Sequence, residues 1–269
     1  MAFQQTLLRT IELAGVGLHG GQPSRVRIHP AGADTGINFA CGGQVIPARA
    51  EFVVSTRRAT ALAKGEATVG TVEHLLAACY GVRIDNALVE VEGCELPALD
   101  GSAAGFTQEL MQTGKNRQEL PVRVLRLTRP VWVSQGERLL LALPASRLRL
   151  TFMGEFPGLG FLSRSFADSP SAFAEDIAPA RTFARRGEIE QLLAQGLGRG
   201  GSLENVVILE EAGPPPGLRF ADEPVRHKLL DLLGDLALLG KRLQAQVIAI
   251  GSGHELNLEL VKKILKEKG

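Results

Sequence analysis

A histidine and an aspartate stand four positions apart, at His227 and Asp231, in a stretch whose apolar residues predict a helix. Residues at this spacing project from one face of a helix, roughly 5–6 Å apart. An imidazole and a carboxylate held in this way can form part of the ligand shell of a divalent metal ion. Asp235 follows on the same face one turn later. An ordinary surface pair on an amphipathic helix would give the same pattern, so this segment alone leaves both explanations open.

Two of the other histidines also lie in motifs whose residue types could bind a metal or act in acid–base catalysis. His74 directly follows Glu73 in a stretch that predicts a second helix, and His254 follows a glycine turn that opens a third. A catalytic zinc ion takes three protein ligands and keeps one position open for water. His74, His227 and Asp231 could supply the three ligands. Glu73 and His254 would then remain as acid–base groups.

Length and composition exclude several classes of protein. The chain has 269 residues, enough for one large domain or two small ones, and its 45% hydrophobic and 22% charged residues are ordinary for a globular protein. A net charge of +1 gives no electrostatic argument for a nucleic-acid partner. No apolar run approaches the ~20 residues of a membrane helix. The N-terminus also lacks the apolar stretch of a secretory signal, so we expect no integral membrane segment. Three scattered cysteines, Cys41, Cys79 and Cys94, favour a reducing compartment, and we expect the cytoplasm.

The elements that must position these residues can be estimated from periodicity and turn residues. Short strands are expected in the front half at 26–29, 36–39, 52–54 and 87–91. Helices are expected from Thr71, which could cap the N-terminus, and over 102–112. The polar stretch 115–121 is expected to connect the two halves.

The back half predicts further strands and three helices. The strands are expected at 122–127, 131–133, 139–143, 148–152 and 244–250, and the helices at 189–194, 223–239 and 254–268. Each half contains a helix with a histidine near its start, and each of these helices leads through a loop to a strand. This weak internal similarity suggests a metal site between two similar halves.

Short motifs in the order in which they occur here resemble the zinc-dependent UDP-3-O-acyl-N-acetylglucosamine deacetylases of lipid A biosynthesis. They are GVGLH (15–19), TVEHL (71–75), ELPALDGS (95–102), ARTF (180–183), GGS (200–202), GLRF (217–220), the segment 227–235 and GHELN (253–257). The resemblance implies an α+β fold of two similar domains, 1–118 and 119–269, each with helices packed against sheet and with the active site at their junction. It implies hydrolysis of the N-acetyl group of UDP-3-O-[(3R)-hydroxyacyl]-N-acetylglucosamine, giving the free amine and acetate. We expect the protein to act as a monomer.

The resemblance also implies a role for each residue of the reaction centre. The zinc ligands of the family match His74, His227 and Asp231. Glu73 matches the general base and His254 the general acid. Two further matches are Asp235, which would hold His254 in its charged form, and Thr182, whose hydroxyl would help to bind the oxyanion.

Substrate contacts are implied on both sides of this centre. Lys228 matches a residue that contacts the sugar head group, Phe183 one that packs on the glucosamine ring, and Phe156 one that stacks on uracil. His19 matches a residue near the substrate. The acyl chain is expected in an insert of the second domain that contains Ile189, Leu193, Gly201, Ser202 and Ile208.

Three positions depart from better-known members of the family. Arg185 and Arg186 stand where apolar residues often line the acyl-chain tunnel, and Gly251 stands where some members carry a lysine for the diphosphate. Arg138 or Arg199 could supply that charge instead. Two alternatives remain: a zinc amidase for a different N-acyl sugar nucleotide, and a binding protein that has lost the chemistry.

Overall fold

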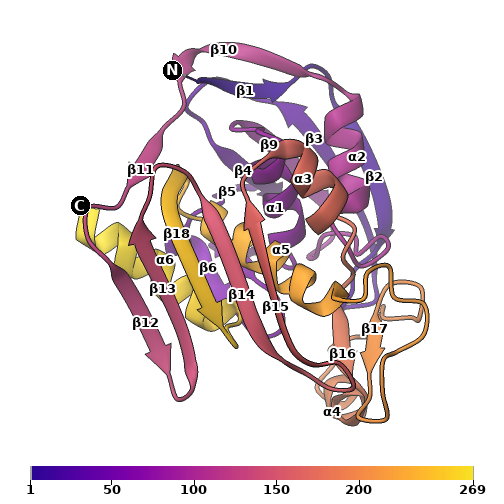
Figure 1. Ribbon diagram of the computed structural model, residues 1–269. Coiled ribbons are helices and arrows are strands. Elements are labelled where there is room, and N and C mark those ends of the chain that lie inside the picture. Colours follow the sequence, from indigo (N-terminus) through magenta and orange to yellow (C-terminus); the bar gives the residue numbers. More distant parts are fainter. Residues whose placement is uncertain (1, 269) are drawn as a thin grey trace.

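The computed structural model describes residues 2–268 and has an α+β fold, as expected (Figure 1). A five-stranded sheet comes from the front half of the chain. Across this sheet the strands run in the order β2 (Ile11–Val16), β3 (Pro23–Pro30), β9 (Ala87–Glu92), β4 (Ile37–Cys41) and β5 (Gln44–Pro47). The expected strands at 26–29, 36–39 and 87–91 are confirmed as β3, β4 and β9.

A larger sheet comes from the back half. Its main strands run in the order β12 (Val131–Gln135), β13 (Arg138–Pro144), β18 (Arg242–Ile250), β14 (Arg149–Phe156) and β15 (Gly160–Ala167), and β11 (Val124–Arg126) also pairs with β18. Buried residues alternate with half-buried ones along β18, and with half-buried or exposed ones along β14, because one face of the sheet packs on helices. β15 was not predicted, since this edge strand is mostly exposed and lacks a clear apolar alternation.

The remaining strands form small sheets. They are β1 (Phe3–Leu7) with β10 (Lys115–Pro121), the hairpin series β6 (Val53–Ser55), β7 (Ala61–Lys64) and β8 (Ala67–Val69), and β16 (Phe183–Arg185) with β17 (Val207–Leu209). The polar stretch 115–121, expected only as a connection, is therefore strand β10. Its backbone pairs with β1, and exposure of nearly all its side chains hid the strand from an apolar pattern.

Six α-helices lie within residues 2–268. They are α1 (Glu73–Gly81), α2 (Ala104–Gln112), α3 (Pro170–Ala172), α4 (Ile189–Ala194), α5 (Glu223–Ala237) and α6 (His254–Lys268). The prediction that Thr71 caps α1 is wrong. Thr71 has a positive φ of 55°, and its hydroxyl donates to Glu95 Oε1 at 2.7 Å instead of to the helix. Within the described residues, no helix is long and apolar enough to span a bilayer.

The close packing of α1 on α5 joins the two halves of the chain at the site. Every residue of α1 is buried, so this helix has no solvent face. Gly234 of α5 lies against the backbone of Glu73, and a Cβ at this position would stand only 2.2 Å from the Glu73 carbonyl oxygen. Because glycine has no side chain, the two helices approach closely enough for residues of both to meet at one site.

Candidate metal centre and its cavities

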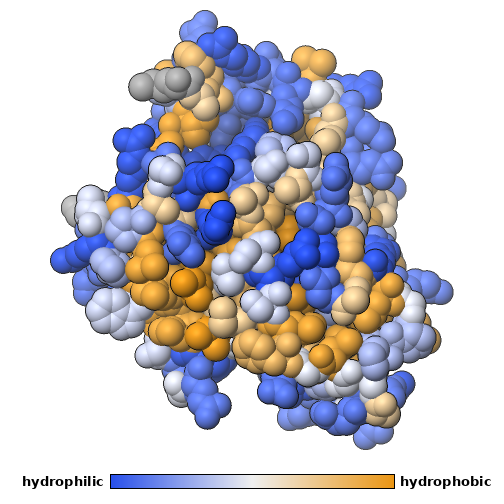
Figure 2. Space-filling view, in the orientation of Figure 1, coloured by the Kyte–Doolittle hydropathy of each residue, from blue (hydrophilic) through white to orange (hydrophobic). Residues whose placement is uncertain are grey.

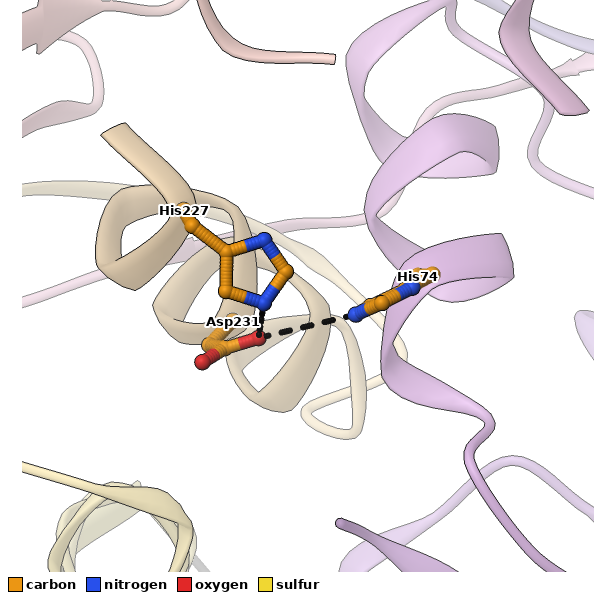
Figure 3. A group of neighbouring side chains, drawn as sticks. All are labelled: His74, His227 and Asp231. Atoms are coloured by element: carbon orange, nitrogen blue, oxygen red, sulfur yellow. Dashed lines mark ion pairs between the residues drawn. The ribbon is translucent and has the colours of Figure 1, made fainter. Parts of the chain in front are cut away.

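Three buried side chains from α1 and α5 converge on one point (Figure 3). His227 Nε2 lies 3.3 Å from Asp231 Oδ1, and His74 Nε2 lies 3.9 Å from the same oxygen. One ligand atom from each of the three lies within 4.8 Å of the others. Zinc bonds of ~2.0–2.1 Å in a tetrahedron place ligand atoms roughly 3.3 Å apart, so the spacing fits a metal centre with a small contraction.

The protonation of this group also fits a metal. His227 Nδ1 lies 3.0 Å from the carbonyl oxygen of Ala180, which only an N–H can bond, so the lone pair is left on Nε2. Burial and the neighbouring His227 lower the pKa of His74 to about 3, which keeps its imidazole neutral. Burial would raise the pKa of Asp231, but the charges of Lys228 and His254 hold it well below its ordinary range.

Glu73 stands beside the metal ligands with one carboxylate oxygen fixed and the other free to react. The backbone N–H of Thr60 donates to Glu73 Oε2 at 3.0 Å. Glu73 Oε1 lies 4.0 Å from His254 Nε2. Burial raises the pKa of Glu73 to about 7, with smaller contributions from Asp231 and Asp235 in the same direction. A carboxylate with such a pKa can accept a proton near neutral pH.

His254 is held in place by the carboxylate of Asp235. His254 Nδ1 donates to Asp235 Oδ2 at 2.8 Å, and this leaves Nε2 facing Glu73 and Asp231. Asp235 also accepts hydrogen bonds from Asn257 Nδ2 and from the Thr60 hydroxyl. Burial lowers the pKa of His254, but the two aspartates outweigh this effect and raise it to about 9. An imidazolium in this place can donate a proton.

The metal centre opens into a cavity of about 610 Å³. Its wall includes Thr182, Phe183 and Lys228, whose ammonium lies 5.3 Å from the centroid of the Phe183 ring. Lys228 also donates to Asp231 Oδ2 at 2.7 Å. Phe156 belongs to the same wall, but it is only 5% exposed and packs edge-to-face on Phe183.

A second, more apolar cavity of about 330 Å³ adjoins the first. Thr182, Phe183 and His19 belong to the walls of both, so the two spaces meet at these residues. The insert residues expected to hold an acyl chain all line the second cavity. They are Ile189, Leu193, Gly201, Ser202 and Ile208. Neither ring nitrogen of His19 has a hydrogen-bond partner among the described residues, although both are buried.

The positions that depart from the family also border these spaces. Arg185 lines the first cavity and Arg186 the second, so a charged residue stands in the wall of each. The side chain of Arg138 lies next to Gly251, and its Cγ is 3.6 Å from the place that a Cβ on residue 251 would take. Arg138 lines the first cavity. Arg199 lines neither, and its backbone N–H donates to the carbonyl of His19.

Several supporting residues were not identified from the sequence. Thr60 and Asn257 hold the acid–base pair, and Gly234 permits the helix contact. Glu223 is fully buried and accepts hydrogen bonds from the backbone N–H groups of Arg181 and Arg219, which fixes the loop before Thr182. Asn257, Gly234 and Glu223 lie in or beside the quoted motifs, which was the only available sign of their roles, whereas Thr60 lies outside all of them.

Similarity to known proteins identifies the family of the chain. The sequence profile of LpxC, described as UDP-3-O-acyl N-acetylglycosamine deacetylase, matches residues 4–266. The chain belongs to this family. It is 42% identical over 272 residues to a UDP-3-O-acyl-N-acetylglucosamine deacetylase from Anaeromyxobacter sp., covering 99% of this chain and 90% of that protein. Proteins of the same name from Thermosynechococcus vestitus and Chlamydia pneumoniae are 44% and 41% identical, each over 98% of this chain and at least 95% of their own.

Proposed function

We propose that this chain hydrolyses the acetamide of UDP-3-O-[(3R)-hydroxyacyl]-N-acetylglucosamine, which releases acetate and the free amine in lipid A biosynthesis. Membership of the deacetylase family supports this activity. The observation that carries the proposal is the convergence of His74, His227 and Asp231 beside Glu73 and His254 at the meeting point of a polar and an apolar cavity.

The metal in this proposal is zinc, held by His74, His227 and Asp231. Two imidazoles and one carboxylate form a ligand set that zinc commonly takes in hydrolases, with a position left open. A zinc ion there would polarise the amide carbonyl and lower the pKa of water toward ~7. The neutral His74 and the ionised Asp231 are already in the protonation states that such a ligand set needs.

Glu73 and His254 divide the proton transfers. The free oxygen of Glu73 accepts the proton of the attacking water, while the bond from Thr60 keeps the carboxylate oriented. The Thr182 hydroxyl donates to the developing oxyanion. His254 then gives a proton to the leaving nitrogen, since an amine leaves poorly without one. Asp235 acts through His254, because it fixes the ring and favours its charged form.

The substrate would extend from this centre in two directions. The 3-O-acyl chain enters the apolar cavity past Ile189, Gly201 and Ser202, where small residues leave room for it. The glucosamine ring packs on Phe183, with Lys228 at its hydroxyls.

The nucleotide would occupy the larger cavity. Phe156 lies in the wall where the uracil would stack, and Arg138 supplies the charge for the diphosphate in place of a side chain at position 251. His19 stands where the two cavities meet and contacts the substrate there.

Three broader features belong to the same proposal. The chain acts as a monomer, since His74, His227, Asp231, Glu73 and His254 already make up a full set of metal ligands and acid–base groups within one chain. It works in the cytoplasm, where its three cysteines, which form no disulfide among the described residues, suit a reducing environment. It divides into domains 1–118 and 119–269, since each part contains a large sheet of its own.

The deciding experiment measures metal and acetate release on one sample. We expect zinc to co-purify with the protein and the nucleotide sugar to be deacetylated, with faster turnover for the 3-O-acylated substrate than for its non-acylated form. Equal turnover of the two would favour an amidase for another N-acyl sugar nucleotide. Zinc at full occupancy without any turnover would instead favour a binding protein.

A further inference from the structure

Part of the outer face of the large back-half sheet, across β12, β13, β18 and β14, is apolar. A sheet that buries one face usually carries polar side chains on the other. The inward residues Leu140 of β13 and Val247 of β18 are fully buried, as expected. The outward residues Leu139 and Leu141 beside Leu140, and Ile248 after Val247, are also apolar, so the usual alternation is missing from this part of the outer side.

Six outward residues define this outer apolar face. They are Trp132, Leu139, Leu141, Met153, Ile248 and Ile250. In one row Trp132 pairs with Leu141, and Leu141 pairs with Ile248. In a second row, two positions along the strands, Leu139 pairs with Ile250, and Ile250 pairs with Met153. Trp132 is 55% exposed, and the other five are half-buried. Figure 2 shows this surface as an orange area over β13 and β18 on the side turned to the viewer.

Basic side chains gather at one end of the outer apolar face. Arg149 begins β14, Arg147 precedes it in the turn, and Arg126 of β11 lies beside Gln244 of β18. All three are exposed, and among residues 2–268 none has a carboxylate within 4.0 Å. This end of the face therefore presents uncompensated positive charge next to apolar side chains.

The size of the face argues against a second copy of the chain as its partner. Four strands ~4.8 Å apart and two rows ~7 Å apart give an apolar footprint on the order of 300 Å². A stable protein interface buries roughly 800 Å² on each partner. An exposed tryptophan, a small apolar surface and adjacent arginines are the combination that binds the interface of an anionic bilayer.

We propose that the outer apolar face docks this protein on an anionic lipid surface. The six apolar side chains contact the acyl-chain boundary, and Arg126, Arg147 and Arg149 contact the phosphate groups. Arg138 and Glu155, at the opposite end of the face, also line the larger cavity. Docking would therefore bring the entrance of that cavity close to the lipid surface. The docking itself does not depend on the deacetylase reaction.

The experiment uses the natural fluorescence of the protein, because Trp132 is its only tryptophan. The protein is titrated with vesicles of phosphatidylglycerol and phosphatidylcholine, and separately with phosphatidylcholine alone. We expect the emission of Trp132 to shift to shorter wavelength with the anionic vesicles, to be quenched by brominated acyl chains, and to revert at high salt. No shift and no co-sedimentation with either vesicle would overturn the proposal.

Paired variants separate lipid docking from other effects. Each arginine at an anionic surface contributes roughly fivefold to partition, so Arg147→Gln with Arg149→Gln should weaken vesicle binding roughly 25-fold. The matched control, Arg9→Gln with Lys64→Gln, removes two exposed charges elsewhere and should bind as the wild type does. Equal weakening by both pairs would mean that only net charge matters, and it would overturn the assignment to this face.

A third variant tests the apolar part of the face. Ile248→Gln should weaken vesicle binding, whereas Leu8→Gln, at an exposed leucine of the front half, should leave it unchanged. Sedimentation without vesicles measures whether the protein is a monomer or a dimer in solution. A dimer that already shields Trp132 would overturn lipid docking in favour of a second copy. Deacetylation of a dispersed substrate should be unchanged in all these variants, so a failure here is distinct from a failure of the proposed function.

Discussion

Replacing Gly234 with alanine should separate the two helices that carry the metal ligands. The new Cβ would stand 2.2 Å from the Glu73 carbonyl oxygen, 2.8 Å from its carbon and 3.0 Å from Cα, all of them backbone atoms. The helices must therefore move apart by roughly 1 Å to restore ordinary contact distances. His74 lies on α1, one residue from this contact, so the displacement moves it away from His227 and Asp231.

The magnitude follows from two opposing effects. Overpacking of a tight contact costs about 1–3 kcal/mol, while alanine favours a helix over glycine by about 1 kcal/mol. We therefore expect a modest net loss of stability, about 0–2 kcal/mol. Metal ligands tolerate shifts of only ~0.2 Å, so affinity for zinc should fall far more than stability, by about 10–100-fold or more.

Competition with a chelator would measure zinc affinity, and denaturant unfolding of the metal-free protein would measure stability. Gly187→Ala is the matched control, because a Cβ there meets nothing within 4 Å. The reasoning is refuted if Gly234→Ala binds zinc as tightly as the wild type, and especially if it is also more stable. Such a result would mean that the close contact of α1 and α5 does not set the ligand geometry.

Four further substitutions test the roles assigned to single residues. Glu73→Ala should retain zinc but lose turnover by ~10²–10⁴-fold, as measured by acetate release, because the base is removed. His227→Ala should lose zinc, which metal analysis of the purified variant would detect. Thr182→Val should reduce kcat by ~10²–10³-fold with little change in zinc content, and an unchanged kcat would exclude the oxyanion contact. Glu223→Gln should lower stability at pH 7 by about 1–3 kcal/mol, since it weakens the bonds to the loop before Thr182. Hydrogen bonds and the charge of Arg181 outweigh burial and hold the pKa of Glu223 below its ordinary 4.5. The stability difference between the wild type and Glu223→Gln should therefore be fully present above pH 4.5 and disappear as the pH falls through the lowered pKa. Unfolding curves at several pH values would measure this dependence.

The sequence predicts those parts of the site that depend on local geometry. His227 and Asp231 share a helix face because four residues make about one turn, and the structure places their ligand atoms 3.3 Å apart. Most strands of both sheets were also predicted, since one buried face imposes an alternation that is visible in the sequence. The exposed strands β10 and β15 were missed, because polar edge strands carry no such pattern.

The contribution of His74 could not be derived in the same way. It lies more than 150 positions from His227, and only the packing of α1 on α5 brings them together. Resemblance to a family supplied this pairing, whereas the spacing of residues did not. Neither the spacing nor the resemblance identified Thr60, whose backbone and hydroxyl reach Glu73 and Asp235 from a loop that shows no motif of its own.

Two loops beside the cavities are each held in place by one carboxylate side chain that accepts several hydrogen bonds. Glu95, in the motif at 95–102, accepts hydrogen bonds from the backbone N–H groups of His19 and Gly20 and from Thr71. Glu223 does the same for the loop that carries Thr182. In both cases one buried or half-buried carboxylate satisfies several N–H groups of a loop that forms no regular structure, and so fixes the loop beside the cavity. Such loops are positioned by single side chains, so a substitution at Glu95 or Glu223 disturbs the site without touching the substrate.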